Sequence, residues 1–289
     1  MAAPKKKPPW LRVRGPSEKS LSDMKSMLDD LHLHTVCESA ICPNVGTCFA
    51  KGTATFMILG DICTRNCGFC SVKHSTPLPV DPEEPLHVAQ AAKKLNLKHV
   101  VITSVTRDDL SDGGAKQFAE TIHQINRLLP DASTDVLIPD LIGSKENLKI
   151  VIDAKPTILA HNLETVPNLY KTARQYSSYK TSLEILEWSK DLDPDIYTKS
   201  GIMLGLGETR EEVLHTMQDL RKVQCDFLTI GQYLRPTSKN IEVYEYIHPD
   251  IFDQYKEDGE QMGFAYVASA PFVRSSFHAE EALQHLQKK

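Results

Sequence analysis

Six of the seven cysteines in this 289-residue chain fall within one short N-terminal window. They form two triplets, and a seventh cysteine stands apart: Cys37, Cys42 and Cys48; Cys63, Cys67 and Cys70; and Cys225. Disulfide frameworks belong to small secreted chains, whereas this chain is long and has no apolar secretory signal. Clustered thiols in a reducing compartment more often bind metal, so we expect these cysteines to be metal ligands.

The composition narrows the class of protein. Apolar residues make up 41% of the chain, enough for a full core in one large α/β-barrel domain or two smaller domains. A net charge of −5 gives no general affinity for nucleic acid. The proline-rich, basic residues 1–14 predict a disordered, solvated tail. No segment approaches twenty consecutive apolar residues, which predicts a cytoplasmic protein without a membrane span.

Short apolar runs alternate with stretches of helical periodicity. The runs, many nearly continuous in Val, Ile and Leu as in strands buried on both faces, are 53–59, 99–105, 135–141, 157–163, 200–206 and 227–234. Apolar residues recur at helical spacing between them, at Phe118, Ile122, Ile125 and Leu129 and at Val213, Met217 and Leu220. Such alternation predicts parallel βα units with right-handed crossovers. Six units indicate an α/β fold with a partial (β/α)6 barrel; a doubly wound sheet is the alternative, because periodicity does not fix strand order.

Three segments are expected along the chain. Residues 1–52 form an N-terminal extension that carries the first triplet and has little strand or helix pattern. Residues 53–245 form the partial barrel. Residues 246–289 form a C-terminal extension with a helix, a short strand at 264–268 and a terminal helix. Within the barrel, Thr209 is placed to cap a helix whose first turn carries Glu211 and Glu212.

The second triplet has the spacing C-x3-C-x2-C and follows the first predicted strand directly. Loops after strands carry the active site of barrel enzymes. Three thiolates within eight residues can hold three irons of a four-iron cluster and leave the fourth iron open to chelate a small molecule. The alternative is a zinc site with His74 as fourth ligand. The spacing is typical of the radical S-adenosylmethionine superfamily, in which the aromatic before the last cysteine, here Phe69, lies near the adenine.

The first triplet has the different spacing C-x4-C-x5-C. Six cysteines are too many for one four-iron cluster. The strand predicted between the triplets, roughly eight residues of about 3.3 Å each, also separates them. The simplest assignment is therefore two clusters, each held by three cysteines.

With both triplets in place, the chain resembles lipoyl synthases over about residues 27 to 280. Besides the cysteines, the matching motifs are GTATFMILG (52–60), TSVTRDDL (103–110), HNLETVP (161–167), KSGIMLGLGE (199–208), GQYL (231–234) and RSSFHA (274–279). One departure is Phe277, where the family usually has tyrosine, which removes a hydroxyl and its hydrogen bond.

The resemblance implies insertion of two sulfur atoms at carbons six and eight of an octanoyl chain. That chain is amide-linked to a lipoyl domain of a 2-oxo acid dehydrogenase or to the glycine-cleavage H protein. Such C–H bonds are too strong for acid–base chemistry, so the cofactor must supply a radical. By resemblance, the second triplet's 4Fe-4S cluster reduces S-adenosylmethionine, and the first triplet's 4Fe-4S cluster donates sulfur and is consumed. A one-electron donor such as ferredoxin or flavodoxin and a cluster-rebuilding protein are the implied partners.

Further site residues follow from matching motifs. Four residues fit a superfamily pattern, G-x-I-x-G-x-x-E, that frames the adenine: Gly201, Met203, Gly205 and Glu208. The alternative for them is a tight strand-to-helix turn. Three residues after the second strand are expected at the methionine or ribose end, or else as turn and cap residues: Ser104, Thr106 and Asp112. At the end of the last barrel strand, Arg235 and Lys239 either meet the carrier protein or are solvated surface charges.

The resemblance also points to a serine as fourth ligand of the sulfur-donating cluster, Ser276 rather than Ser275. Neighbouring side chains of an extended chain point in different directions, so one serine is expected to reach it. Arg274 would stabilise the anionic ligand by charge-assisted hydrogen bonding. The alternative is that both serines merely form a turn of the C-terminal segment. Cys225 is predicted to be a buried bystander.

Two other functions remain open at this point. A two-cluster radical enzyme that thiolates transfer RNA would normally carry a basic nucleic-acid module, and none is visible. A non-enzymatic protein would use zinc or clusters only to fold its cysteine-bearing extension.

Overall fold

The computed structural model describes residues 6–12, 18–276 and 280–287 and is built around one eight-stranded sheet. Six consecutive parallel strands overlap the six predicted runs: β2 (Thr55–Ile58), β5 (His99–Ser104), β6 (Ser133–Leu137), β7 (Ile158–Ala160), β8 (Tyr197–Leu204) and β9 (Phe227–Gln232). Each pairs with the next one in the chain. A doubly wound sheet would reverse its strand order at a switch point. The sheet therefore forms the predicted partial barrel.

Both ends of the chain contribute strands to this sheet. β1 (His34–Thr35) pairs antiparallel with β2, and β10 (Tyr266–Ser269) pairs parallel with β9. The short strand predicted at 264–268 thus becomes a seventh parallel strand. A separate ribbon, β3 (Ile62–Cys63) with β4 (Lys73–His74), brackets the loop of the second cysteine triplet.

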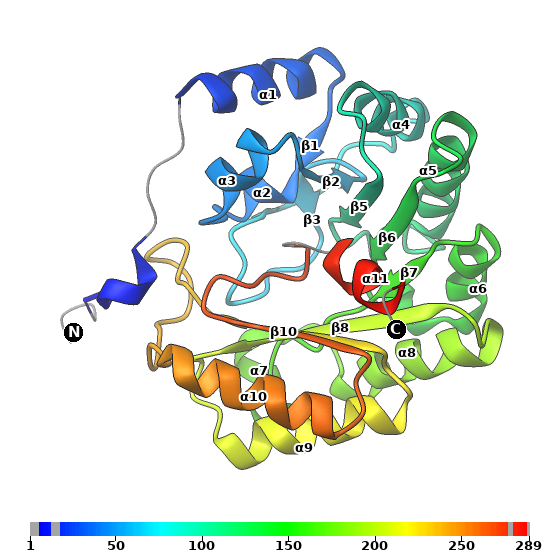
Figure 1. The fold of residues 1–289 in the computed structure, drawn as a ribbon. Helices are drawn as coiled ribbons and strands as arrows, with labels where there is room; N and C mark the ends of the chain where they lie inside the picture. Colours follow the sequence, from blue (N-terminus) through cyan, green and yellow to red (C-terminus); the bar gives the residue numbers. More distant parts are fainter. Residues whose placement is uncertain (1–5, 13–17, 277–279, 288–289) are drawn as a thin grey trace.

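Helices cover the outer face of the sheet (Figure 1). They are α4 (Glu84–Lys94), α5 (Ala115–Leu128), α6 (Lys145–Asp153), α8 (Tyr179–Leu192), α9 (Arg210–Lys222) and α10 (Pro249–Gln261), with the short α7 (Tyr170–Ala173), η2 (Leu141–Gly143) and η3 (Pro167–Leu169) in loops and α11 (Glu280–Gln287) near the C-terminus. The predicted apolar stripe of α9 is buried, as are Phe118, Ile122 and Ile125 of α5, whereas Leu129 follows the end of α5 and is half-buried. The predicted cap of α9 is confirmed, since Thr209 and Glu212 form a reciprocal capping box.

The N-terminal segment is more structured than its sequence suggested. It contains α1 (Glu18–Asp30), α2 (Val36–Ser39) and α3 (Val45–Ala50), so the expectation of little helix pattern was wrong. The buried residues of α1, Met24, Met27 and Leu28, do have helical spacing, but they are a short stripe among Ser, Asp and Lys.

The expected disorder is also wrong for residues 6–12, although most of these residues are exposed. Pro9–Leu11 form the short helix η1, Leu11 is buried, and the Trp10 ring lies 4.9 Å from that of His248. Burial of Leu11 and the ring contact of Trp10 hold the segment against the body of the protein. In the part of the chain that the structure describes, no helix is long and apolar enough to cross a membrane.

Candidate active site

A cavity of about 340 Å³ opens at the carboxyl ends of the barrel strands. Its size falls within the range of small-molecule sites, about 300–1,000 Å³. Five cysteines line it, namely Cys37, Cys42, Cys63, Cys67 and Cys70. The two triplets, which come from different segments of the chain, therefore meet at one cavity.

The second triplet lies on a loop that begins directly after β2. Leu59 and Gly60 turn the chain there with positive φ of 68° and 86°, and the buried Glu84 carboxylate accepts the N–H of Leu59 at 2.8 Å. The loop continues over the strand ends. Thr64 Oγ1 donates to the carbonyl of Thr106 at 3.0 Å, which ties the cysteine loop to the loop after β5.

Arg65, inside the triplet, fastens this loop more strongly. Its guanidinium donates to both oxygens of Asp108 and both oxygens of Asp140, and also to Ser177 Oγ. Burial by itself would raise the pKa of Asp140, but the adjacent guanidinium holds that pKa below its usual range. The sequence placed Arg65 beside the cysteines but carried no signal for its partners, because those arrive from other loops.

The thiols of the second triplet accept backbone hydrogen bonds. Cys63 Sγ lies 3.3 Å from the N–H nitrogen of Thr106 and 3.4 Å from that of Arg65, and Cys70 Sγ lies 3.5 Å from that of Val72. Burial nevertheless raises the pKa of Cys67 to about 11 and that of Cys70 to about 12. Burial by itself therefore favours the protonated thiols of Cys67 and Cys70, and an adjacent positive charge would be needed to hold them as thiolates.

The first triplet is spread over two short helices and the turn between them. Cys37 lies on α2, Cys48 lies on α3, and Cys42 follows a turn at Ile41, whose φ is +51°. Burial raises the pKa of Cys37 to about 11 and also raises that of Cys48. Burial therefore acts on these two thiols in the same direction as on those of the second triplet.

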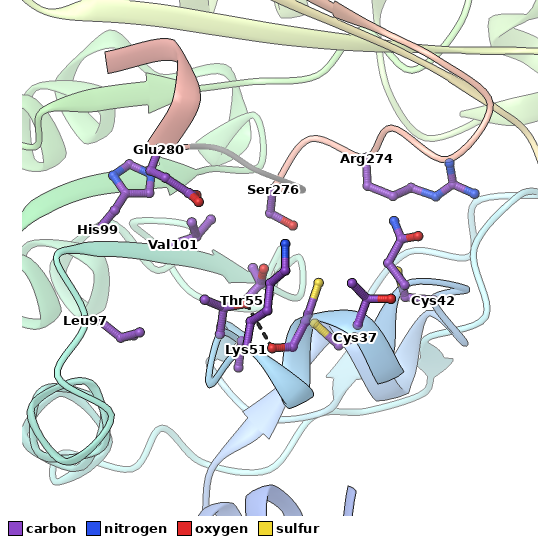
Figure 2. A pocket seen from close by; sticks show the side chains of 15 residues that line it. Cys37, Cys42, Lys51, Thr55, Leu97, His99, Val101, Arg274, Ser276 and Glu280 are labelled. Atoms are coloured by element: carbon purple, nitrogen blue, oxygen red, sulfur yellow. Dashed lines mark hydrogen bonds between the residues drawn. The ribbon is translucent and has the colours of Figure 1, made fainter. Parts of the chain in front are cut away.

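The C-terminal segment crosses the first triplet and brings Ser276 to it. A second, smaller pocket is lined by all three cysteines of that triplet together with Arg274 and Ser276. Figure 2 shows Ser276 pointing from the C-terminal segment toward the side of the pocket that carries Cys37 and Cys42. Ser276 lines both this pocket and the central cavity, whereas Ser275 lines the central cavity.

Two contacts fix the path of this segment. Asn44, between Cys42 and Cys48, donates its side-chain N–H to the carbonyl of Phe272 at 2.8 Å. A Cβ on Gly231 of β9 would lie 2.1 Å from the carbonyl oxygen of Val273, so glycine is required for this close approach. Phe277 lies outside the described residues.

Five of the residues matched to S-adenosylmethionine binding line the central cavity: Phe69, Ser104, Thr106, Gly201 and Met203. Within the described residues, two buried polar atoms there have no hydrogen-bond partner, Ser104 Oγ and Asn162 Oδ1. Buried polar atoms are rarely left unpaired, so these two indicate a polar ligand. The cavity thus fits an amino-acid nucleoside such as S-adenosylmethionine beside a cluster.

The other three matched residues, Gly205, Glu208 and Asp112, make hydrogen bonds within local turns. The Glu208 carboxylate accepts the N–H of Gly205 at 2.5 Å and of Leu206 at 2.9 Å, and Gly205 has φ +96°. Both residues build a tight turn after β8 and are not among those that line the cavity. Asp112 accepts the N–H groups of Gly114 and Lys116 and so caps α5.

Several cavity residues were not singled out from the sequence. Arg174, which is buried, donates to the carbonyl of Asn162 at 2.7 Å. Glu164 accepts from Asn162 Nδ2 at 3.0 Å, has φ +67°, and has a pKa raised by burial. Its backbone therefore lies in the left-handed region, which residues other than glycine adopt infrequently. The motif HNLETVP contained Asn162 and Glu164, but Arg174 has no local signal.

The structure also bears on the zinc alternative. Within residues 6–12, 18–276 and 280–287, no three His, Cys, Asp or Glu side chains converge closely enough to bind one metal ion. His74, the suggested fourth ligand, is exposed on β4.

Comparison with known proteins decides the family. Residues 57–220 match the model of the radical SAM superfamily. A lipoyl synthase from Caldanaerobacter subterraneus is 55% identical over 96% of this chain and 97% of its own length. One from Azotobacter vinelandii is 50% identical over 96% of this chain and 85% of its own. The chain belongs to the lipoyl synthase family.

Solved structures agree with this family at the level of fold. Methylornithine synthase matches with a TM-score of 0.58 and 13% identity, over 89% of this chain and 84% of its own. Streptococcus suis SuiB bound to S-adenosylmethionine matches with a TM-score of 0.59 and 14% identity, over 88% and 60%. At such identities the likeness concerns the partial barrel alone.

Membership of the lipoyl synthase family confirms the predicted activity, a radical insertion of sulfur into a protein-bound octanoyl group. It also confirms the cofactor prediction, because lipoyl synthases use two 4Fe-4S clusters and S-adenosylmethionine. Transfer-RNA thiolation and a purely structural zinc protein are set aside by the same near full-length identity.

Proposed function

We propose that in this member of the lipoyl synthase family Cys63, Cys67 and Cys70 hold the cluster that binds S-adenosylmethionine. The sulfur-donating cluster is held by the first triplet with Ser276 as its fourth ligand. The observation that carries this assignment is a pair of pockets that share lining residues from the first triplet and the C-terminal segment, while the second triplet lines the larger one. The core of residues 53–245 would then perform radical generation, with residues 1–52 and 246–289 completing the sulfur-donating site.

The chemistry divides between cofactor and protein. When bound, the clusters and S-adenosylmethionine supply the 5′-deoxyadenosyl radical and the sulfur. The chain holds the thiolates, orients the ligand and excludes water. Phe69, Gly201 and Met203 contribute apolar lining to the cavity, while Ser104 and Thr106 contribute hydroxyls to it. Burial matters because a radical in a wet site would be quenched by side reactions.

The partners follow from the reaction. The substrate is an octanoylated lipoyl domain or H protein, whose lysine arm must reach the cavity between the triplets. A low-potential one-electron carrier such as ferredoxin or flavodoxin would supply electrons. A cluster-rebuilding protein would restore the consumed site. The family relationship supports the carrier domain as a class; the electron donor and the rebuilding protein rest on the chemistry alone.

Anaerobic incubation with an octanoylated lipoyl-domain peptide, S-adenosylmethionine and a strong reductant, read by mass, tests the assignment. We expect Cys67→Ala to abolish cleavage of S-adenosylmethionine. Cys42→Ala should retain some cleavage and insert no sulfur, because its radical-generating site is intact. Lipoyl product from Cys42→Ala would show that the sulfur-donor assignment is wrong.

A further inference from the structure

The loop that follows β9 crosses the loop of the second cysteine triplet. We call residues 235–246 the strap. Asn240 of the strap donates its side-chain N–H to the carbonyl of Cys70 at 2.7 Å and to that of Gly68 at 3.3 Å. The backbone N–H of Ile241 donates to the same Gly68 carbonyl at 3.0 Å. The strap is therefore hydrogen-bonded to the cysteine loop near the last cysteine of that loop.

The strap is itself held in one conformation. Arg235 donates to the carbonyl of Asn240 at 2.8 Å and to that of Ser238 at 2.6 Å. The Tyr233 hydroxyl donates to the carbonyl of Ile241 at 2.8 Å. Arg235, expected either at the carrier interface or as a solvated charge, thus organises its own loop. These bonds hold the Asn240 amide in a fixed position. Its hydrogen bonds to the cysteine loop therefore cost little additional conformational entropy.

The strap is also anchored at its far end. The buried Gln232 side chain donates to the carbonyl of Glu245 at 3.0 Å and accepts the N–H of Ile247 at 2.8 Å. The N–H of Tyr244 donates to the carbonyl of Gly205 at 2.8 Å. A Cβ on Gly205 would lie 2.3 Å from the carbonyl oxygen of Glu245, so the turn after β8 is shaped to accept the strap.

The cysteine loop is pinned from the opposite side at the same place. Gly68 donates its N–H to the carbonyl of Ala173 at 3.0 Å, and a Cβ on Gly68 would lie 2.8 Å from the carbonyl oxygen of Thr172. Gly68 is thus held between α7 and the strap. Cys70 is two residues further on and accepts from Asn240 through its carbonyl.

We propose that Asn240 is a positioning residue for the Cys70 thiolate. By holding the Gly68 and Cys70 carbonyls, its amide fixes the Gly68–Phe69 and Cys70–Ser71 peptide planes, which flank Phe69 and Cys70, and hence the direction of the Cys70 side chain. This inference rests on the proposed role of Cys70 as a ligand of the cluster that binds S-adenosylmethionine. An amide suits the position because its N–H faces two carbonyl oxygens, which a carboxylate would repel.

The test uses the holoenzyme with both clusters and four variants. Asn240→Ala removes the amide, and Asn240→Asp keeps its shape while removing both N–H donors. Asn240→His restores one N–H donor. Its ring nitrogen Nδ1 lies the same number of bonds from the backbone as the amide nitrogen of asparagine. Lys239→Ala is the matched control, since Lys239 is the exposed neighbour in the strap.

The measurements are S-adenosylmethionine affinity and the electron paramagnetic resonance spectrum of the reduced enzyme before and after that ligand is added. We expect the Ala and Asp variants to bind S-adenosylmethionine about tenfold more weakly, a factor that corresponds to about one hydrogen bond. Their ligand-induced spectral change should be altered, while the iron of the first triplet is retained. The His variant should move back toward the parent, and Lys239→Ala should match the parent.

Parent-like spectra and affinity in both Asn240→Ala and Asn240→Asp would overturn the proposal. Loss of both clusters together with the native circular dichroism would overturn it as well, because Asn240 would then support the fold rather than Cys70. A different result is expected if Cys70 is not a ligand of the cluster that binds S-adenosylmethionine. In that case the parent enzyme itself would show no spectral response to S-adenosylmethionine that depends on Cys70.

Discussion

At the scale of single residues, surroundings separate the seven cysteines. Cys225 is 0% exposed, its sulfur lies 3.4 Å from the carbonyl oxygen of Phe227, and burial raises its pKa to about 12. It packs between α9 and β9, away from both cavities. The six triplet cysteines instead line a cavity or pocket. Burial disfavours the thiolate form of Cys37, Cys67 and Cys225 alike, so the pKa does not separate the proposed ligands from the bystander. Their positions relative to the cavity and pocket separate them.

We therefore expect Cys225→Ser to retain both clusters and full activity. The serine hydroxyl can donate to the Phe227 carbonyl, so the loss of stability should be about 1 kcal/mol, typical of a mild core substitution. Iron content and thermal unfolding measure this directly. A loss of about half the iron would contradict the bystander assignment.

Ser276 is the residue whose role the sequence left most open. Because Ser276 lines the pocket of the first triplet and Ser275 does not, we expect Ser276→Ala to change the Mössbauer spectrum and stop product formation. Ser275→Ala serves as the control and should turn over normally. The opposite pattern would transfer the ligand role to Ser275, and two silent variants would remove serine ligation altogether.

At the scale of elements, the sulfur-donating site depends on how closely β9 and the C-terminal segment approach. In Gly231→Ala the new Cβ would meet the carbonyl oxygen of Val273 at 2.1 Å, so the segment that carries Ser276 must shift. We expect this variant to lose iron from the first triplet while it still cleaves S-adenosylmethionine. Iron analysis and a cleavage assay measure the two effects separately.

Gly263→Ala is the matched control for that prediction. Gly263 has φ +88° and nothing within 4 Å of the position that a Cβ would take, so alanine there adds backbone strain without a clash. It should lower stability slightly and keep both clusters. Equal iron loss in the two variants would mean that general destabilisation, not the path of the segment, explains the result.

At the scale of the whole molecule, stability should depend on pH through a histidine at the cavity wall. Burial lowers the pKa of His161 to about 4 from an ordinary value of 6.5. The ring lies between the Ile138 carbonyl at 2.9 Å and Ser182 Oγ at 3.0 Å. The folded chain thus holds the ring neutral, whereas the unfolded chain protonates it below about pH 6.5. The contribution of His161 is complete above that pH and is lost as pH falls toward 4.

We expect His161→Gln to flatten part of this dependence. Between about pH 7 and about pH 5, the melting temperature of the parent should fall more steeply than that of the variant. The reason is that unfolding of the parent is coupled to the uptake of up to one proton by His161. Anaerobic thermal unfolding of the cluster-loaded proteins makes the comparison. His123→Gln, at an exposed position on α5, should keep the parent slope. Identical slopes in all three proteins would exclude His161 as the source.

Local patterns in the sequence determined much of this protein. The six barrel strands are short apolar runs, and α9 begins where Thr209 and Glu212 form their capping box, because such features depend on neighbours a few residues apart. The cysteine spacings indicated the kind of cluster for the same reason. The helices η1, α1, α2 and α3 of the N-terminal segment were missed, since they are short or carry few apolar residues.

Tertiary structure decided the strand order, the meeting of the triplets and the contacts that hold the cysteine loop. Asn240 reaches Cys70 across 170 residues, and Asn44 reaches Phe272 across 228. Arg65 likewise finds two carboxylates on other loops. Such contacts exist because parallel strands bring their carboxyl ends to one edge, where loops distant in sequence become neighbours. No local pattern encodes which side chains then meet, because that depends on loop closure across the whole barrel.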